Sequence, residues 1–199
     1  MNKKQITGII LCGGKSIRMG QNKALMRLDN IPLVEIAINK LKKICDRILI
    51  STNSPELDYL PYQKVTDKIE GIGPIAGVYS SLHQSETEHN LIITCDTPFV
   101  SSEIMEYLFL QSAGYDIVLP EFKGKLQSLT GYFNRSLLDF IEQEINSEHY
   151  KPILMFQQSK LNVIKIDETD KDFGEHLFFN INSMDDFQEA SRILANISK

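Results

Sequence analysis

The residues of this chain that could do chemistry begin with a glycine-rich loop that carries two cations. The apolar run Ile6–Leu11 leads directly into Cys12-Gly13-Gly14, and Arg18 and Lys23 follow. Adjacent glycines let a backbone approach a ligand closely, and their N–H groups can form a nest for an anion. Arg18 adds a bidentate phosphate donor and Lys23 a compact positive charge. We therefore expect a phosphate-binding loop, the plain alternative being an ordinary turn with solvated cations.

Two common phosphate-loop patterns do not fit this segment. Gly14-Lys15-Ser16 matches the end of G-x-x-x-x-G-K-[ST], but the position that requires the first glycine holds Ile9. The glycine that follows Gly14 is Gly20, which also excludes G-x-G-x-x-G. What remains is a triphosphate loop that depends on a metal-binding carboxylate elsewhere in the chain.

Two acidic residues follow strand-like runs and are candidates for carboxylates that act together with the loop. Asp96 follows the apolar run Leu91–Thr94, and Mg²⁺ is commonly bound by a few carboxylates together with phosphate oxygens and water. The alternative for Asp96 is a cap of the helix predicted near Ser102. Asp67 follows the short run Lys64-Val65-Thr66 and can bind a sugar hydroxyl or the edge of a base. Taken alone, an acidic residue at this position is equally well explained as one without a function.

Near the end of the chain, two amides precede the last predicted helix. Asn180 and Asn182 lie just before Ser183-Met184-Asp185-Asp186, which resembles a capping box. Asn182 can act as a neutral ligand for a metal or a phosphate, or simply as part of the helix start.

The elements that must position these residues alternate along the chain. Short runs rich in apolar and β-branched residues are typical of buried strands, and they occur at Ile6–Leu11, Arg47–Ser51, Leu91–Thr94 and Ile117–Leu119. Amphipathic stretches between them predict helices, one beginning with Pro32 at its first position and one capped by Ser102. This alternation predicts an α/β fold with a mostly parallel sheet and helices on both faces. Ligands of such sheets bind at the carboxyl ends of the strands.

Composition bounds the class of protein. The 199 residues, of which 42% are hydrophobic, predict one domain over 1–199, and the net charge of −5 argues against a nucleic-acid or anionic-membrane partner. The N-terminal apolar run is too short for a signal peptide or a membrane span, so we expect a cytoplasmic protein. The three cysteines show no C-x-x-C pair, and the four histidines show no metal-ligand spacing. Free thiols and packed or surface histidines are expected.

Taken together, these motifs resemble the MobA-type nucleotidyltransferases. The resemblance begins with Leu11-Cys12-Gly13-Gly14, Arg18-Met19-Gly20 and Lys23, and it spans almost the whole chain in the order of the family. It continues through the following segments: Leu28–Leu33, Asp67, Gly73-Pro74-Ile75-Ala76-Gly77, Thr94–Pro98 and Asn180–Ser183.

The resemblance implies a three-layer α/β/α, Rossmann-like fold of the nucleotide-diphospho-sugar transferase type. It also implies transfer of GMP from GTP to the terminal phosphate of the molybdopterin-type molybdenum cofactor, with release of pyrophosphate and transient contact with other proteins of cofactor biosynthesis. Arg18, Lys23 and Asp96 would be catalytic, and Asp96 would bind Mg²⁺. The residues that would contact GTP are Leu11, Cys12, Gly13, Gly14, Lys23, Asp67 and Asp96, with Gly77, Asn180 and Asn182 as further candidates.

Some positions depart from the family pattern. Cys12 stands where alanine is usual, and Ser51 stands where some members have a nucleotide-binding asparagine, although Asn53 lies two residues on. Gln127–Gly131 lacks a proline that is often found there. The loop Cys12-Gly13-Gly14 resembles the guanine branch, whereas relatives that use CTP tend to carry Ala-Ala-Gly. Two alternatives stay open: a related enzyme that uses CTP or acts on a sugar phosphate, and a non-catalytic nucleotide-binding adaptor.

Overall fold

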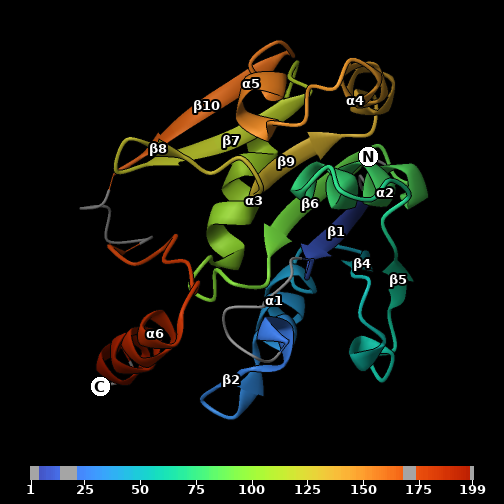
Figure 1. Ribbon diagram of the computed structural model, residues 1–199. Coiled ribbons are helices and arrows are strands. Elements are labelled where there is room, and N and C mark those ends of the chain that lie inside the picture. The colour runs from blue at the N-terminus through green and yellow to red at the C-terminus, as the bar shows by residue number, and fades with distance from the viewer. Residues whose placement is uncertain (1–4, 14–21, 168–173, 198–199) are drawn as a thin grey trace.

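The computed structural model of the protein describes residues 5–13, 22–167 and 174–197. Its main sheet consists of β1 (Ile6–Leu11), β4 (Arg47–Ser51), β5 (Gln63–Val65), β6 (His89–Thr94), β7 (Ile117–Phe122), β8 (Lys125–Leu126), β9 (Gly131–Asn134) and β10 (Leu161–Ile166). The strand order is β10-β7-β9-β6-β1-β4-β5, and β8 pairs with β7 (Figure 1).

The sheet is mostly parallel, as the alternating pattern predicts. Strand β1 lies between β6 and β4 and is parallel to both; β4 is parallel to β5, and β10 to β7. The two apolar runs predicted at Ile6–Leu11 and Arg47–Ser51 have the bounds of β1 and β4, while β6 and β7 are longer than predicted. Strand β9 is the unexpected one, because it inserts antiparallel between β6 and β7.

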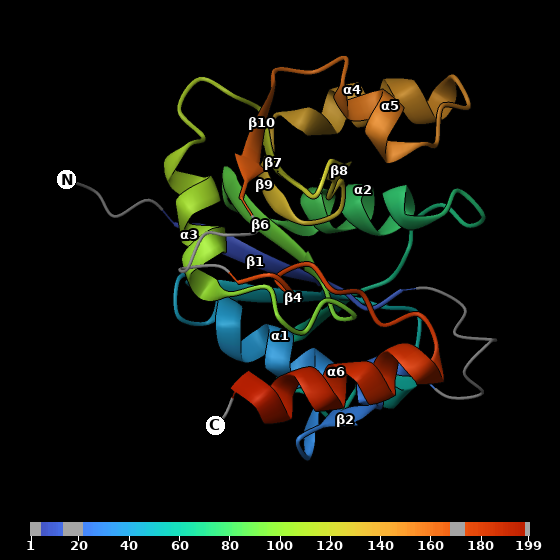
Figure 2. The same ribbon diagram turned by 90° about the vertical axis from the view of Figure 1, so that its left-hand side faces the viewer.

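Helices cover both faces of the sheet (Figure 2). They are α1 (Leu33–Leu41), α2 (Pro74–Gln84), α3 (Ser102–Leu110), α4 (Leu137–Asn146), α5 (Pro152–Phe156) and α6 (Met184–Ile197). Alternate residues of β1 serve the two faces: Ile6 and Ile10 pack with α1 and α3, whereas Ile9 and Leu11 pack with α2, α4 and α5. Burial on both faces explains why the central strands read as continuous apolar runs.

A third, smaller cluster holds α6 against a short hairpin. The hairpin is β2 (Arg27–Leu28) and β3 (Ile31–Pro32), and Ile181 and Ala190 belong to the same apolar cluster as Met26, Leu28 and Leu33. Figure 2 shows α6 lying along β2 and α1. Within the described ranges, no helix has the length and apolar character needed to cross a membrane.

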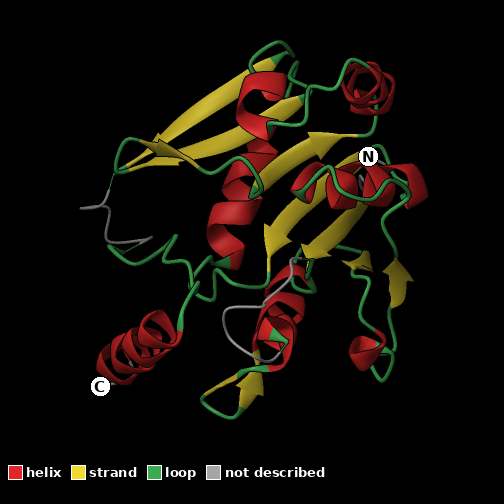
Figure 3. Cartoon of the chain, viewed as in Figure 1, coloured by secondary structure: helices red, strands yellow, loops and turns green. Residues whose placement is uncertain are grey.

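Two helix starts differ from the sequence prediction. Pro32 is the N-cap of α1 and not its first residue, because it is extended (ψ 141°) and pairs with Arg27 in the hairpin. The cap of α3 is Ser101, whose Oγ accepts a hydrogen bond of 3.2 Å from the backbone N–H of Ile104, so neither Ser102 nor Asp96 caps this helix. The coloured cartoon of Figure 3 shows how loops join these elements.

Gly131 at the start of β9 gives a prediction about stability. Its φ is +156°, and a Cβ added there would lie 2.3 Å from the backbone oxygen of Val118. We expect Gly131→Ala to lower the free energy of unfolding by about 3 kcal/mol, because the strand must move away from a fixed backbone atom. The measurement is urea unfolding followed by circular dichroism.

The matched control is Gly114→Ala. Gly114 also has a positive φ (+83°), but an added Cβ would meet nothing within 4 Å. Gly114→Ala should lower the free energy of unfolding by only about 1 kcal/mol, because it adds backbone strain but no steric clash. Equal losses for the two variants would contradict the steric explanation.

Candidate active site

The candidate site lies at the carboxyl ends of neighbouring parallel strands, where ligands of such sheets bind. Cys12 follows β1, Asp96 follows β6, Asn53 follows β4 and Asp67 follows β5. Because β6, β1, β4 and β5 are adjacent and parallel, these residues come together at one edge although they are far apart in the sequence. Gly14 and Arg18, the remaining residues predicted for the loop, lie outside the described residues.

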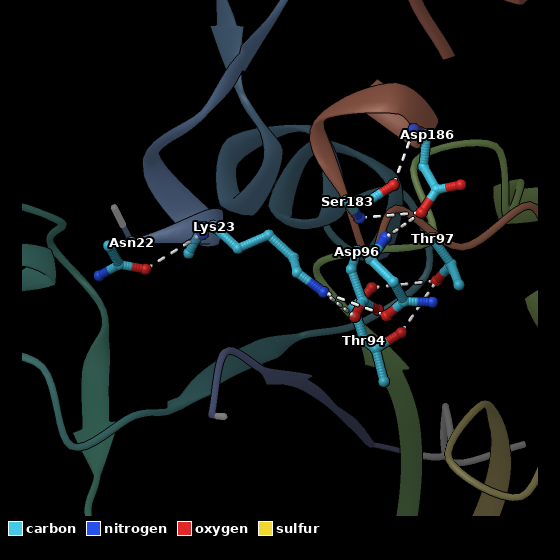
Figure 4. A network of polar contacts seen from close by, with 9 residues as sticks. Asn22, Lys23, Thr94, Asp96, Thr97, Ser183 and Asp186 are labelled. Atoms are coloured by element: carbon cyan, nitrogen blue, oxygen red, sulfur yellow. Dashed lines mark hydrogen bonds and ion pairs between the residues drawn. The ribbon is translucent and has the colours of Figure 1, made fainter. Parts of the chain in front are cut away.

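Lys23 and Asp96 form the centre of the site. The Nζ of Lys23 lies 3.0 Å from Oδ2 of Asp96, and the two side chains are only 17% and 21% exposed (Figure 4). Lys23 opens the short 3₁₀ helix η2 (Lys23–Leu25), which Asn22 caps. The other carboxylate oxygen of Asp96, Oδ1, is buried and has no hydrogen-bond partner among the described residues. A buried carboxylate oxygen without a partner is costly unless something binds it, so Oδ1 of Asp96 is available to a ligand.

The turn that carries Asp96 is held on several sides. The backbone N–H of Cys95 donates to the Leu11 carbonyl (3.1 Å), and the hydroxyl of Thr97 donates to the Thr94 carbonyl (3.1 Å). Lys40 of α1 donates to the carbonyl of Pro98, and burial lowers the pKa of Lys40 to about 8, with the nearby charge of Lys43 adding to this effect. These contacts fix the direction in which the carboxylate points.

The segment before α6 closes the site from a third side. The backbone N–H of Ile181 donates to the carbonyl of Asp96 (2.9 Å), and Oδ1 of Asn182 lies 3.4 Å from the Lys23 Nζ. The structure therefore brings Asn182 to the central pair, while Asn180 is exposed. The predicted capping box is confirmed: Ser183 and Asp186 exchange bonds of 2.8 and 3.1 Å. Hydrogen bonds to the carboxylate, first from the backbone N–H of Asn182, hold the pKa of Asp186 below its usual value.

Asp67 is held by a residue that the sequence prediction did not include. The amide of Asn53 donates to Oδ2 of Asp67 (2.8 Å) and accepts from its backbone N–H (2.9 Å). Ser51, by contrast, is buried, and its Oγ would lie 2.7 Å from a Cβ placed on Gly77. The asparagine that contacts Asp67 is therefore at position 53 and not at position 51. Its position two residues after β4 was the available signal.

Gly77 and the loop residues show two different uses of glycine. Gly77 lies within α2, and an added Cβ would crowd Ser51 and come 3.7 Å from Oδ1 of Asp67. Gly13 is exposed, and an added Cβ there would meet nothing within 4 Å. Gly77 is thus needed for packing under Asp67, whereas Gly13 leaves open space next to the loop backbone.

The environment of Cys12 disfavours its thiolate form. A hydrogen bond with the side chain of Cys95 raises the pKa of Cys12 well above its ordinary value, and burial and the negative charge of Asp96 raise it further. The backbone N–H of Cys12 donates to the Ser51 carbonyl (2.8 Å), which anchors the start of the loop. Within the residues described, no three His, Cys, Asp or Glu side chains gather as a metal site. A cation at Asp96 would therefore have to share its coordination with a ligand and water.

Comparison with known proteins identifies the family of the chain. Residues 8–161 match the MobA-like NTP transferase domain. The chain is 34% identical to a probable molybdenum cofactor guanylyltransferase of Flavobacterium johnsoniae, over 92% of this chain and 95% of the relative. A protein of the same description from Carboxydothermus hydrogenoformans is 30% identical over 96% of this chain and 98% of the relative.

A solved structure shares the fold. It is the molybdopterin-guanine dinucleotide biosynthesis protein A of Archaeoglobus fulgidus, with a TM-score of 0.78, 24% identity, and coverage of 96% of this chain and 99% of that one. The predicted three-layer arrangement of the nucleotide-diphospho-sugar transferase type is thereby confirmed.

The state of the thiols gives a prediction about reactivity. Burial, with the charge of Asp46, raises the pKa of Cys45 to about 12, so its thiolate fraction at pH 8 is roughly a thousandfold below that of a free cysteine. The pKa of Cys12 is also raised, which lowers its reactivity, and Cys95 is buried and therefore poorly accessible to a reagent. We expect Ellman's reagent to label the native protein slowly at all three positions and the guanidinium-unfolded protein at once. Rapid labelling of Cys12 in the native protein would contradict this account.

Proposed function

Because the chain belongs to the MobA-like NTP transferase family, we propose that it transfers GMP from GTP to the molybdopterin form of the molybdenum cofactor and releases pyrophosphate. The observation that carries the proposal is the pairing of Lys23 with Asp96 at 3.0 Å, next to Asn182, at the carboxyl edge of the sheet. A cation and a carboxylate beside a glycine loop are what a triphosphate with its metal ion requires.

The chemistry is a displacement at phosphorus. An oxygen of the acceptor's terminal phosphate attacks the α-phosphorus of GTP, and a new O–P bond forms. The bond from the α-phosphorus to the oxygen bridging to the β-phosphate breaks, and pyrophosphate leaves with that electron pair. No strong general base is needed, because a phosphate nucleophile with a second pKa near 6 is largely ionised at neutral pH. The neutral thiols of Cys12 and Cys45 have no role as nucleophiles here.

The protein's task is to bring two anionic reactants together in line. Lys23, with its amine held by Asp96 and Asn182, would bind the β- and γ-phosphates and stabilise the charge that develops on pyrophosphate. Arg18 of the loop would assist. On the other side of the site, Asp67, fixed by Asn53, would accept hydrogen bonds from the nucleoside. The loop backbone at Leu11, Cys12 and Gly13 would contact the nucleotide between these two anchors.

A divalent metal ion fits the carboxylate of Asp96. Its buried Oδ1 has no protein partner among the described residues, and the oxygen ligands that Mg²⁺ prefers can be completed by phosphate oxygens and water. Asn182 would contribute a neutral oxygen. When bound, Mg²⁺ would neutralise phosphate charge during transfer. We propose Mg²⁺ in this role, and transient contact of the enzyme with proteins that supply or receive the cofactor in the cytoplasm.

The choice of base gives one prediction. The loop Cys12-Gly13-Gly14 resembles the guanine branch of the family, so GTP with Mg²⁺ should raise the thermal midpoint of the protein more than ATP, CTP or UTP at equal concentration. The physical reason is mass action, since the tightest ligand stabilises the native state most. A clearly larger shift with CTP or UTP would instead favour the related enzyme that uses a pyrimidine nucleotide.

Removal of the carboxylate gives the direct test of the transfer reaction. The parent protein, incubated with GTP, Mg²⁺ and molybdenum cofactor, should form the guanine dinucleotide cofactor. Asp96→Asn should lower kcat/KM at least about a hundredfold, because the metal ligand and the partner of Lys23 are both lost. Chromatography of the dinucleotide product measures both quantities.

The control for this variant is Asp139→Asn, which removes an exposed carboxylate from α4, a helix that carries none of the proposed site residues. It should keep near-parental activity. Activity of Asp96→Asn within about tenfold of the parent, a loss of only ~1.4 kcal/mol, would contradict the metal-ligand role. A parent that binds GTP but forms no dinucleotide would favour the non-catalytic adaptor.

A further inference from the structure

Asn22, the residue before Lys23, makes more contacts than a helix cap requires. Its Oδ1 accepts the backbone N–H of Ala24 (3.1 Å), which is the capping bond of η2. Its amide nitrogen also donates to Oγ of Ser54 (3.2 Å) and to Oε2 of Glu56 (2.8 Å). Ser54 in turn donates to the same carboxylate oxygen (3.1 Å). Both N–H bonds and the oxygen of one amide are therefore used.

These contacts join two parts of the site that come from different strands. Ser54 and Glu56 belong to the connection between β4 and β5, at the start of the 3₁₀ helix η3 (Pro55–Leu57). Asn53, the residue that holds Asp67, directly precedes Ser54. On the other side, Lys23 directly follows Asn22 and reaches across to Asp96 and Asn182. The amide of Asn22 thus links the Asn53–Asp67 pair, proposed to bind the nucleoside, with Lys23, proposed to bind the phosphates.

The chemistry of this position is specific to an amide. A capping oxygen alone could come from serine or aspartate as well. The amide of Asn22 accepts from the helix through Oδ1 and also donates through its nitrogen to a carboxylate 2.8 Å away. An aspartate here would place a second negative charge against Glu56, and a serine would keep the cap but lose the two N–H groups that reach Ser54 and Glu56. The three side chains can therefore be exchanged to separate capping from the bridge to Glu56.

We propose that Asn22 is a positioning residue for nucleotidyl transfer: its amide bridge to Ser54 and Glu56 sets the place of Lys23 relative to the Asn53–Asp67 corner. This inference rests on the proposed function, because Lys23 matters only if a triphosphate binds there. Asn22 acts through Lys23 and is not itself in contact with the reacting groups.

The test is a set of exchanges at the two ends of the bridge, in the full-length protein. Asn22→Asp should weaken the binding of GTP·Mg²⁺, measured by calorimetry, about tenfold, with a similar fall in kcat/KM that appears mainly in KM. Glu56→Gln keeps an acceptor for Asn22 and should stay within about threefold of the parent. The double variant, Asn22→Asp with Glu56→Gln, restores a donor–acceptor pair with its direction reversed and should recover to within about threefold.

Asn22→Ser separates the bridge from the cap. Because serine keeps the capping bond, a role in capping alone predicts parental behaviour, whereas the bridge predicts a loss close to that of Asn22→Asp. A merely structural defect would lower the amount of active protein and the thermal midpoint but leave the dissociation constant for GTP unchanged. Parental affinity of Asn22→Ser and Asn22→Asp, or failure of the double variant to recover, would overturn the proposal.

The outcome is separate from that of the proposed function. If the parent forms no dinucleotide, guanylyl transfer fails, but the parent and its four variants can still be compared by their affinity for whichever nucleoside triphosphate stabilises the parent most. Recovery of that affinity in the double variant would support the bridge. If the parent is active and the variants do not differ from it, the bridge alone fails.

Discussion

The structure depends on the hydrogen bonding of β1 to parallel neighbours on both sides. Leu11 is paired with Thr94 of β6 and with Ser51 of β4, so the residues that follow these strands emerge at one level. That constraint brings Cys12, Asp96 and Asn53 to one edge. The apolar residues that alternate between the two faces anchor the sheet by burial, which is the dominant favourable term in folding. A shift of β1 by one residue would exchange its faces and displace the loop together with them.

Among the described residues of this edge, the charged side chains of the site each have a polar partner. Lys23 faces Asp96, and Asp67 faces Asn53. The Lys23–Asp96 pair is mostly shielded from solvent, where a charge interaction is stronger than at the surface. Oδ1 of Asp96 has no hydrogen-bond partner among the described residues, and the raised pKa of Cys12 keeps its thiol from adding a negative charge at neutral pH. Net charge therefore says little about this site, because an acidic protein can still bind a triphosphate through one lysine, one metal ion and a few N–H groups.

Much of the sheet could be predicted from the sequence, since β1, β4 and β6 are continuous apolar runs, and Asp96 was a candidate because it lies two residues after one of them. Strand β9 does not, because four residues, Gly131–Asn134, are too few to show a period, and antiparallel insertion leaves no local signal. The 3.0 Å contact between Lys23 and Asp96 joins residues 73 positions apart, so only the fold can show it. Asn53 was missed as a functional residue because its partner, Asp67, belongs to another strand.

The place of Asn182 has a consequence for the growing chain during synthesis. Strands β1, β4, β5 and β6 all come from the first half of the sequence, so this part of the sheet can begin to form while later residues are still being added. Ile181 and Asn182, which close the site over Asp96, are synthesised well after Lys23 and Asp96. A chain that stops before them would keep Lys23 and Asp96 but lack the third wall of the site. Assembly of the site therefore has to wait for a segment that is synthesised long after the strands that carry its first residues.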